Sequence, residues 1–255
     1  MKSQQSPLPE QKTSTDDSRQ SFTTMRGVQM IVSVAVLMAT LFTLWNPRSV
    51  FRTPSLSEML AQQTSETSLR VSQDRQIGLL AGYWRSERGK VCADGVREEQ
   101  ITLAVAERTA VLLNTAGYQV DIFEENDVDL LNYKGVALVA IYAGECGNPP
   151  ASLSGFLIAT ELKPAFPDKS NTLAVCMAEK YANTTGLSFS YQIIPPDQPL
   201  SALFRQVDPT TPTLMIQIGA LGADRELLTE QTQKVAQGIF NGLFCYIELN
   251  KTNEE

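Results

Sequence analysis

Short apolar runs alternate with longer amphipathic segments between Gln76 and Leu249, and this alternation limits the folds open to the chain more than any other feature. Six runs have the length and composition of β-strands, at residues 76–82, 118–123, 136–143, 155–161, 188–194 and 213–219. Three segments carry apolar side chains at helical spacing, at residues 98–115, 168–183 and 229–248. Strands that alternate with helices predict an α/β fold in which helices flank a mostly parallel sheet.

An uncharged apolar run precedes this domain and extends from Val28 to Trp45. As a helix it would span about 27 Å, which is close to the thickness of a bilayer core. A cleaved signal peptide is the alternative, but the polar segment before the run is long and no A-x-A cleavage site follows it. We therefore expect an uncleaved single-pass transmembrane helix at residues 28–45.

The segments around the apolar run are polar and differ in positive charge. Four cations precede the run and two follow it closely, and these are Lys2, Lys12, Arg19, Arg26, Arg48 and Arg52. The positive-inside rule places residues 1–27, a disordered tail, in the cytoplasm and the rest of the chain outside. We interpret residues 46–75 as a stalk, 76–250 as the folded domain and 251–255 as a tail. The predicted location is the cell membrane, with the C-terminal domain extracytoplasmic.

Charge and cysteine content narrow the range of partners and compartments. The chain has 21 basic and 28 acidic residues, so it lacks the basic footprint of a nucleic-acid-binding protein. Four cysteines lie in the folded domain, and in an oxidising compartment an even number predicts disulfides. Four cysteines allow three pairings, and the alternative is four small buried apolar side chains.

Not one of the 255 residues is histidine, so the chain lacks the commonest zinc ligand and the commonest general base. Three predicted strands nevertheless end in small-residue turns that carry a polar side chain. The turns are Ala81-Gly82-Tyr83-Trp84, Ile141-Tyr142-Ala143-Gly144 and Ile216-Gln217-Ile218-Gly219. Ligands bind at the carboxyl ends of strands in open α/β sheets, and Glu98 begins the helix that follows the first strand. We therefore predict a binding site formed by Tyr83, Trp84, Glu98, Tyr142 and Gln217.

In this order the segments resemble the zinc-dependent N-acetylmuramoyl-L-alanine amidases of the amidase-3 type, which are cell-wall hydrolases. The resemblance covers residues 76–249 and implies a muramoyl-amidase-like α/β fold. In that family a histidine after the first strand, a glutamate early in the next helix and a histidine after a central strand bind zinc. A glutamate in a late strand is the general base.

Set on this sequence, the resemblance implies a degenerate member of the family. Tyr83 and Tyr142 stand at the histidine positions, Glu98 is retained, and Gln217 stands at the position of the base; residues 224–228 match the segment that follows. A neutral phenol is a poor substitute for imidazole, and an amide cannot take a proton from water. We expect no bound zinc, no other cofactor and no zinc-type hydrolysis, although the family consists of enzymes.

Each of these positions also has a structural interpretation. Acidic residues are common in the first turn of a helix, and we favour that explanation for Glu98. Tyr83 and Trp84 are expected to pack the end of the sheet rather than to form a platform for a ligand. Tyr142 is expected to hydrogen-bond Glu98 or Gln217 and to fill the volume of the absent metal. The Pro-rich loop at 194–205 could form a rim of the site or an ordinary surface connection.

The resemblance also suggests how the cysteines pair. Cys92 and Cys146 would lie in loops beside the former metal site, and we predict a disulfide between them. We predict a second disulfide, between Cys176 and Cys245, that links two helices. The residues near Cys245 that would permit the helices to approach closely are Gly238, Asn241 and Gly242. The alternative is a substitute metal site of Glu98 with the two thiolates of Cys92 and Cys146.

Together these features predict a membrane-anchored, catalytically inactive amidase-like domain that binds peptidoglycan fragments, such as muramyl peptides, or a protein partner in the envelope. The first alternative is an active peptidoglycan amidase that uses the substitute metal site. The second is a purely structural module that serves as a spacer on its anchor.

Overall fold

The computed structural model describes residues 34, 36–37, 75–147, 154–162 and 164–253. The chain divides into two compact units, residues 1–62 and 63–255. The predictions of a tail at 1–27, an anchor at 28–45 and a stalk at 46–75 fall almost entirely outside the described residues. Within the described parts of the chain, no helix combines the length and apolar character needed to cross a membrane.

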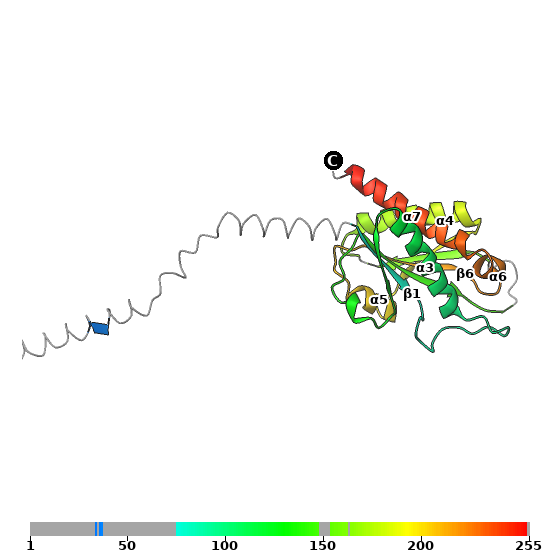
Figure 1. The fold of residues 1–255 in the computed structure, drawn as a ribbon, viewed down its shortest axis with the longest axis horizontal. Helices are drawn as coiled ribbons and strands as arrows, with labels where there is room; N and C mark the ends of the chain where they lie inside the picture. The colour runs from blue at the N-terminus through cyan, green and yellow to red at the C-terminus, as the bar shows by residue number, and fades with distance from the viewer. Residues whose placement is uncertain (1–33, 35, 38–74, 148–153, 163, 254–255) are drawn as a thin grey trace, which may run out of the picture. The chain divides into compact units, whose positions relative to one another are not determined.

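A six-stranded sheet forms the centre of the second unit, with the strand order β2-β1-β3-β6-β4-β5 (Figure 1). The strands are β1 (Gln76–Ala81), β2 (Gln119–Phe123), β3 (Ala137–Gly144), β4 (Phe156–Glu161), β5 (Phe189–Ile194) and β6 (Thr213–Ala220). Four of the five neighbouring pairs are parallel, which confirms the predicted α/β fold with a mostly parallel sheet. The exception is β4, which runs antiparallel to β6, so β4 and β5 point the opposite way from the other four strands.

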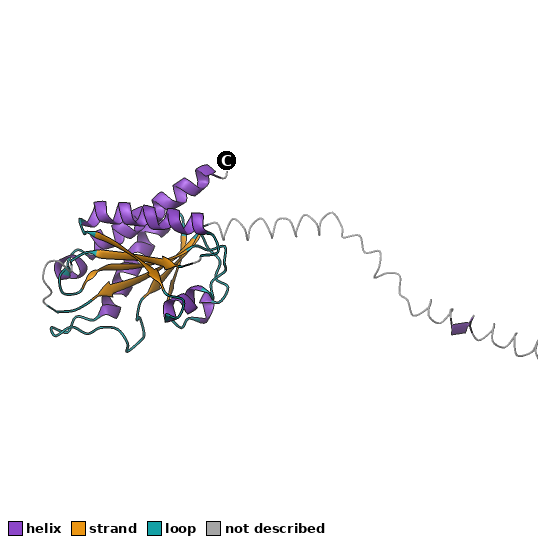
Figure 2. Cartoon of the chain, turned by 180° about the vertical axis from the view of Figure 1, so that it is seen from behind, coloured by secondary structure: helices purple, strands orange, loops and turns teal. Residues whose placement is uncertain are grey.

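Helices cover the sheet unequally. The long helices α3 (Glu98–Thr115), α4 (Pro167–Thr185) and α7 (Thr232–Asn253) contribute to one apolar core on one face of the sheet. Figure 2 shows α4 and α7 above the strands. The short helix α5 (Pro199–Phe204) packs on the other face. Two further short helices, η2 (Val128–Leu130) and α6 (Arg225–Thr229), lie in connections. The predicted last helix was placed three residues early, since α7 begins at Thr232 and not at Thr229.

Each face of the sheet carries its own apolar core. Leu79 and Ile141 belong to the core under the long helices, whereas Leu80 and Ala140 belong to the core under α5. Neighbouring residues of a strand point to opposite faces, so β1 and β3 are buried on both sides. This double burial explains why these strands are continuous apolar runs in the sequence.

A disulfide between Cys176 and Cys245 joins α4 to α7, as predicted. A Cβ atom on Gly238 would lie 2.7 Å from the ring of Tyr181, and one on Gly242 would lie 2.6 Å from the sulfur of Met177. The two glycines therefore permit the close approach of the helices, which bury both side chains completely.

Candidate functional site

The site predicted from the sequence is a cavity of about 510 Å³ at the carboxyl ends of β1 and β3 and beside β6. We call it the Tyr142 cavity. Tyr83, Glu98, Tyr142 and Gln217 all line it, so the structure brings together four of the five predicted residues. Helix α5 and its flanking residues form one wall, which confirms that the Pro-rich loop rims the site.

Trp84 is the predicted residue that lies outside the cavity. It packs against the core under the long helices, and the guanidinium of Arg85 lies 4.4 Å from the centre of its ring. The preferred prediction for Trp84, packing at the end of the sheet, therefore agrees with the structure.

Glu98, the first residue of α3, is completely buried and holds two segments of the chain together. Its Oε1 accepts a hydrogen bond of 2.9 Å from the backbone N–H of Ala143 at the end of β3. Its Oε2 accepts from the backbone N–H of Lys90 at 3.2 Å and from the ammonium of Lys90 at 3.3 Å. Glu98 is an acid in the first turn of α3, as expected, and in addition its buried carboxylate joins the loop that contains Lys90 to the end of β3.

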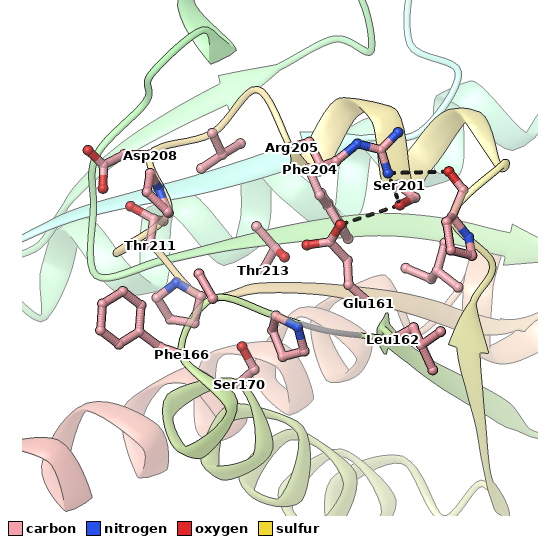
Figure 3. Close-up of a pocket in the computed structure, with 17 residues that line it drawn as sticks. Glu161, Leu162, Phe166, Ser170, Ser201, Phe204, Arg205, Asp208, Thr211 and Thr213 are labelled. Carbon is pink, nitrogen blue, oxygen red and sulfur yellow. Dashed lines mark hydrogen bonds between the residues drawn. The ribbon is translucent and has the colours of Figure 1, made fainter.

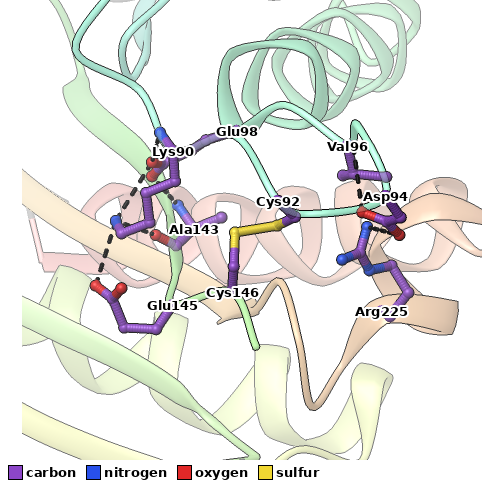
Figure 4. The surroundings of a disulfide bond; sticks show 9 residues. All are labelled: Lys90, Cys92, Asp94, Val96, Glu98, Ala143, Glu145, Cys146 and Arg225. Atoms are coloured by element: carbon purple, nitrogen blue, oxygen red, sulfur yellow. Dashed lines mark hydrogen bonds and ion pairs between the residues drawn. A yellow bond between two sulfur atoms is a disulfide. The ribbon is translucent and has the colours of Figure 1, made fainter. Parts of the chain in front are cut away.

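Lys90 supplies the positive charge next to Glu98 (Figure 4). Its Nζ also donates to the carbonyl oxygen of Ala143 at 3.3 Å and lies 3.7 Å from the carboxylate of Glu145. The ring centre of Tyr83 is 5.9 Å away. Lys90 was not predicted from the sequence, because nothing in the loop from 85 to 97 marks it as the partner of a residue eight positions later.

A disulfide between Cys92 and Cys146 fixes this loop to the segment after β3, as predicted. Figure 4 shows the bridge beside Lys90 and Glu98, with an ion pair of 2.9 Å between Asp94 and Arg225 on its other side. The alternative metal site needed two free thiolates at these positions. Because the two sulfur atoms are bonded to each other, that set of ligands does not exist in this structure.

Tyr142 projects into the cavity and donates its hydroxyl hydrogen to Oε1 of Glu125 at 2.8 Å. The expected partner, Glu98 or Gln217, was therefore wrong, since Glu98 is already engaged by Lys90 and Ala143. Glu125 also forms an ion pair of 2.5 Å with Arg88. Burial and the nearby carboxylate of Glu125 raise the pKa of Tyr142, so its phenol remains neutral. Arg88 and Glu125 were not predicted from the sequence, because they lie in separate loops and carry no local signal.

Gly82 provides the space that the ring of Tyr142 occupies. A Cβ atom at this position would lie 2.5 Å from that ring and 2.7 Å from the carbonyl oxygen of Ile141. The next residue, Tyr83, has a φ of 59°, which L-residues adopt rarely, and its ring meets that of Tyr142 edge to face with centroids 5.3 Å apart. Burial is the main cause that raises the pKa of Tyr83 as well.

Gln217 lies directly opposite Tyr142 in the register of β6 and β3. A Cβ atom on Gly144 would lie 2.7 Å from Nε2 of Gln217, so its amide group packs against the bare backbone at the end of β3. The amide provides one acceptor and two donors for a ligand but no basic group.

The residues in this cavity do not fit the zinc ion that the sequence resemblance implies. A catalytic zinc site needs three protein ligands and an open position. Both phenols are neutral, and the carboxylate of Glu98 is engaged by an ammonium group and a backbone N–H. Among the residues that the structure describes, no cluster of three His, Cys, Asp or Glu side chains could hold a metal.

Comparison with solved structures identifies the fold. The chain is similar to the N-acetylmuramoyl-L-alanine amidase AmiC2 of Nostoc punctiforme, at 16% identity and a TM-score of 0.53 over 68% of this chain and 97% of that one. It is also similar to the CwlD amidase of Clostridioides difficile in complex with the GerS lipoprotein, at 19% identity and a TM-score of 0.57 over 69% of this chain and 100% of that one. A third similar structure is the amidase Ami1 of Mycobacterium smegmatis, at 19% identity and a TM-score of 0.54 over 70% of this chain and 99% of that one.

Comparison of the sequence itself gives no such match. No protein-family model matches the chain, and no curated protein does. At these identities, structural similarity establishes architecture and not activity. The described domain has the fold of the N-acetylmuramoyl-L-alanine amidases, with phenols and an amide at three of the four positions where the resemblance implies reactive groups.

Proposed function

We propose that this chain is a membrane-anchored, extracytoplasmic amidase-like protein that does not hydrolyse its ligand. In this proposal the Tyr142 cavity binds a peptidoglycan fragment, such as a muramyl peptide, or a segment of an envelope protein. Residues 28–45 form the anchor. The two disulfides support an oxidising compartment for the domain.

One observation carries the proposal: the ammonium of Lys90 sits against the carboxylate of Glu98. Glu98 is the only residue of the implied zinc-ligand set that the chain retains. An intramolecular cation neutralises this buried charge, so the folded protein does not need an external cation for that purpose.

Loss of the base is an independent obstacle to hydrolysis. Gln217 has the shape of a glutamate but no basic oxygen, so it cannot activate a water molecule. The loss of the zinc ligands prevents binding of a metal, whereas the loss of the base prevents proton transfer from water. Restoring either alone should therefore leave the protein inactive.

The lining of the cavity supports binding of a ligand rich in amides and hydroxyls. Four side-chain amides line it, and these are Asn126, Gln198, Gln206 and Gln217. Each offers both a donor and an acceptor, which suits peptide bonds and sugar hydroxyls. Its volume of about 510 Å³ is in the range of small-ligand sites. The structural neighbours are amidases of muramoyl-L-alanine bonds, and CwlD was solved with a lipoprotein partner, which supports both kinds of ligand.

Three measurements on the full chain in detergent test the proposal. We expect substoichiometric zinc by elemental analysis, no cleavage of muramyl peptides, and retention on insoluble peptidoglycan. Gln206→Ala with Gln198→Ala should weaken retention, whereas Gln237→Ala, a change of the same type on α7, should not. Stoichiometric zinc or cleavage would overturn the inactive assignment. Absence of retention would overturn the peptidoglycan ligand and leave the envelope protein or the spacer.

A further inference from the structure

Strand β5 lies at one end of the sheet and is exposed on both of its faces. It pairs with β4 on one side, and among the strands that the structure describes none pairs with its other side. All of its residues are exposed except the last, Ile194. An edge of this kind presents backbone N–H and C=O groups with which a further strand can pair.

The apolar side chains of β5 form one exposed row, which consists of Phe189, Tyr191 and Ile193 and which we call the β5 row. These side chains are 48%, 46% and 42% exposed, and they share a face of the strand because their spacing is two residues. Phe189 lies opposite Phe156 in the register with β4, and the two ring centres are 5.3 Å apart. Because Phe156 belongs to the core under the long helices, the β5 row continues that core to the open edge of the sheet.

The sequence of β5 lacks the features that usually protect an edge strand. Natural sheets place charged residues, prolines or bulges at their edges, whereas β5 (FSYQII) contains no charge and no proline. The opposite edge of the sheet, β2, carries Asp121 at its centre, and its apolar side chains Val120 and Ile122 pack against the core. Of the two edges, β5 is therefore the one whose composition favours pairing.

The backbone of β5 directs its polar groups outward at the same residues. The carbonyl oxygen of Ser188 accepts a hydrogen bond of 2.9 Å from the N–H of Phe156 in β4. In a parallel ladder, consecutive residues direct their N–H and C=O groups to alternate sides, so those of Phe189, Tyr191 and Ile193 point away from β4. The β5 row thus combines exposed apolar side chains with backbone groups that face the open edge.

The pattern of β5 is symmetric about Tyr191, which favours a second copy of the same strand as the partner. The segment Phe-Ser-Tyr-Gln-Ile alternates apolar and polar residues identically in both directions from the tyrosine. In an antiparallel pair related by a two-fold axis at Tyr191, each Phe189 lies opposite Ile193 and each Ser190 opposite Gln192 of the partner subunit. Apolar side chains then meet apolar ones, polar side chains meet polar ones, and no charges come together.

We propose that two copies of this chain associate through β5, antiparallel and centred on Tyr191, and so join their two sheets into one. Backbone hydrogen bonds of the β5 row hold the strands together, and the two rows cover each other on the face of the long helices. The hydroxyl of Tyr191 is already paired with that of Thr160, so the ring can face the partner without an unsatisfied polar group. One pair of strands is a small interface, so the association should be reversible. The proposal is independent of the ligand assigned to the Tyr142 cavity.

Cysteine trapping in the full chain in detergent tests the pairing. The four native cysteines form two disulfides, so an introduced cysteine is the only thiol of the chain. In the proposed pair the two Cα atoms at position 191 are about 5.5 Å apart, which a disulfide can bridge. Under mild oxidation Tyr191→Cys should give at least tenfold more covalent dimer than Val175→Cys, which places a thiol at an exposed position of α4. Equal amounts of dimer from the two variants would overturn the proposal.

A mixture of two variants tests the register. Phe189→Cys and Ile193→Cys should each give little dimer alone, because equivalent positions lie four residues apart along the strands, roughly 13 Å. When the two variants are mixed they should cross-link, since each thiol then faces the other. Dimer from Phe189→Cys alone at the level of Tyr191→Cys would exclude the pairing centred on Tyr191.

A charge variant tests the association without oxidation. Tyr191→Lys would set two ammonium groups opposite each other, and sedimentation equilibrium in density-matched detergent should show at least tenfold weaker dimerisation than in wild type. Val175→Lys is the matched control and should dimerise like wild type, and thermal unfolding checks that both variants are folded. A wild-type protein that stays monomeric, or a Tyr191→Lys variant that dimerises equally well, would overturn the proposal. Protection of Tyr191→Cys from a thiol reagent in the monomer would assign the edge to another segment of this chain and overturn it too.

Discussion

A second cavity of about 530 Å³, which we call the Glu161 cavity, lies on the other side of α5 and is lined by Glu161, Ser201 and Arg205 (Figure 3). Its volume is close to the 510 Å³ of the Tyr142 cavity, but the charged groups of the two cavities have different partners. In the Tyr142 cavity, Lys90 neutralises Glu98 and Arg88 neutralises Glu125. In the Glu161 cavity, Glu161 has one long hydrogen bond from a hydroxyl. Volume alone therefore does not identify a binding site. Among the described residues, the informative difference is that the acidic groups of the Tyr142 cavity are paired with cations, whereas the contact of Glu161 is with a hydroxyl.

The largest expected effect comes from the disulfide that lies beside Lys90 and Glu98 of the Tyr142 cavity. Replacing Cys92 and Cys146 together by alanine should lower the free energy of unfolding by about 4 kcal/mol, because the bridge closes a loop with a sequence separation of 54. Urea unfolding followed by the fluorescence of Trp84, one of two tryptophans and the one in the described domain, measures the change. An unchanged free energy of unfolding would contradict a stabilising role for this bridge.

The next effect concerns the internal cation. Lys90→Met leaves the fully buried Glu98 without its positive partner and should lower the free energy of unfolding by about 3 kcal/mol. Adding Glu98→Gln should recover part of this loss, since the amide oxygen still accepts from Ala143 and no charge remains buried. Urea unfolding of both single variants and the double variant gives the coupling. Additive losses would mean that the ion pair has no role in stability.

A smaller effect is expected from overpacking beside Tyr142. Gly82→Ala would place a methyl group 2.5 Å from the tyrosine ring, and displacement of that ring should lower the free energy of unfolding by about 2 kcal/mol. Gly117→Ala serves for comparison. A Cβ atom there meets no atom within 4 Å, but the φ of Gly117 is +90°, so this variant measures the cost of backbone strain without a clash. Measured in a Tyr142→Ala background, Gly82→Ala should cost less, because only the contact of 2.7 Å with the carbonyl oxygen of Ile141 remains; an equal cost in both backgrounds would contradict a clash with the ring.

The smallest effect depends on pH and belongs to the second cavity. The pKa of Glu161 is raised by burial, so the folded state holds this proton more tightly than the unfolded state, and stability falls as pH rises from about 4.5 through the raised value. Glu161→Gln should therefore be more stable than wild type at pH 7 and equal to it below pH 4.5. Thermal unfolding across pH 4 to 8 tests this, and a constant difference between the proteins would refute it.

The sequence predicted the regular elements well because burial leaves a direct record in their composition. The continuous apolar runs of β1 and β3 reflect burial on both faces, and the small residues of α7 predicted its approach to α4. Both disulfides were also predicted correctly.

Other features could not be predicted, because they depend on contacts between distant segments. Periodicity does not encode strand direction, so the reversal of β4 and β5 was not visible, and neither was the cavity at their carboxyl ends. Helix α5 is too short for a periodic pattern and begins with a proline. Lys90 and Glu125 become site residues only when their loops are brought to Glu98 and Tyr142 by the fold.

The two disulfides also determine how the domain responds to mechanical load. The bridged segments have sequence separations of 54 and 69, and they do not overlap along the chain. Under tension applied at the chain ends, these segments cannot be drawn out, which removes roughly 180 and 230 Å of extensible length. Under such a load the chain can lengthen only through its unbridged parts, before residue 92, between 146 and 176 and after 245.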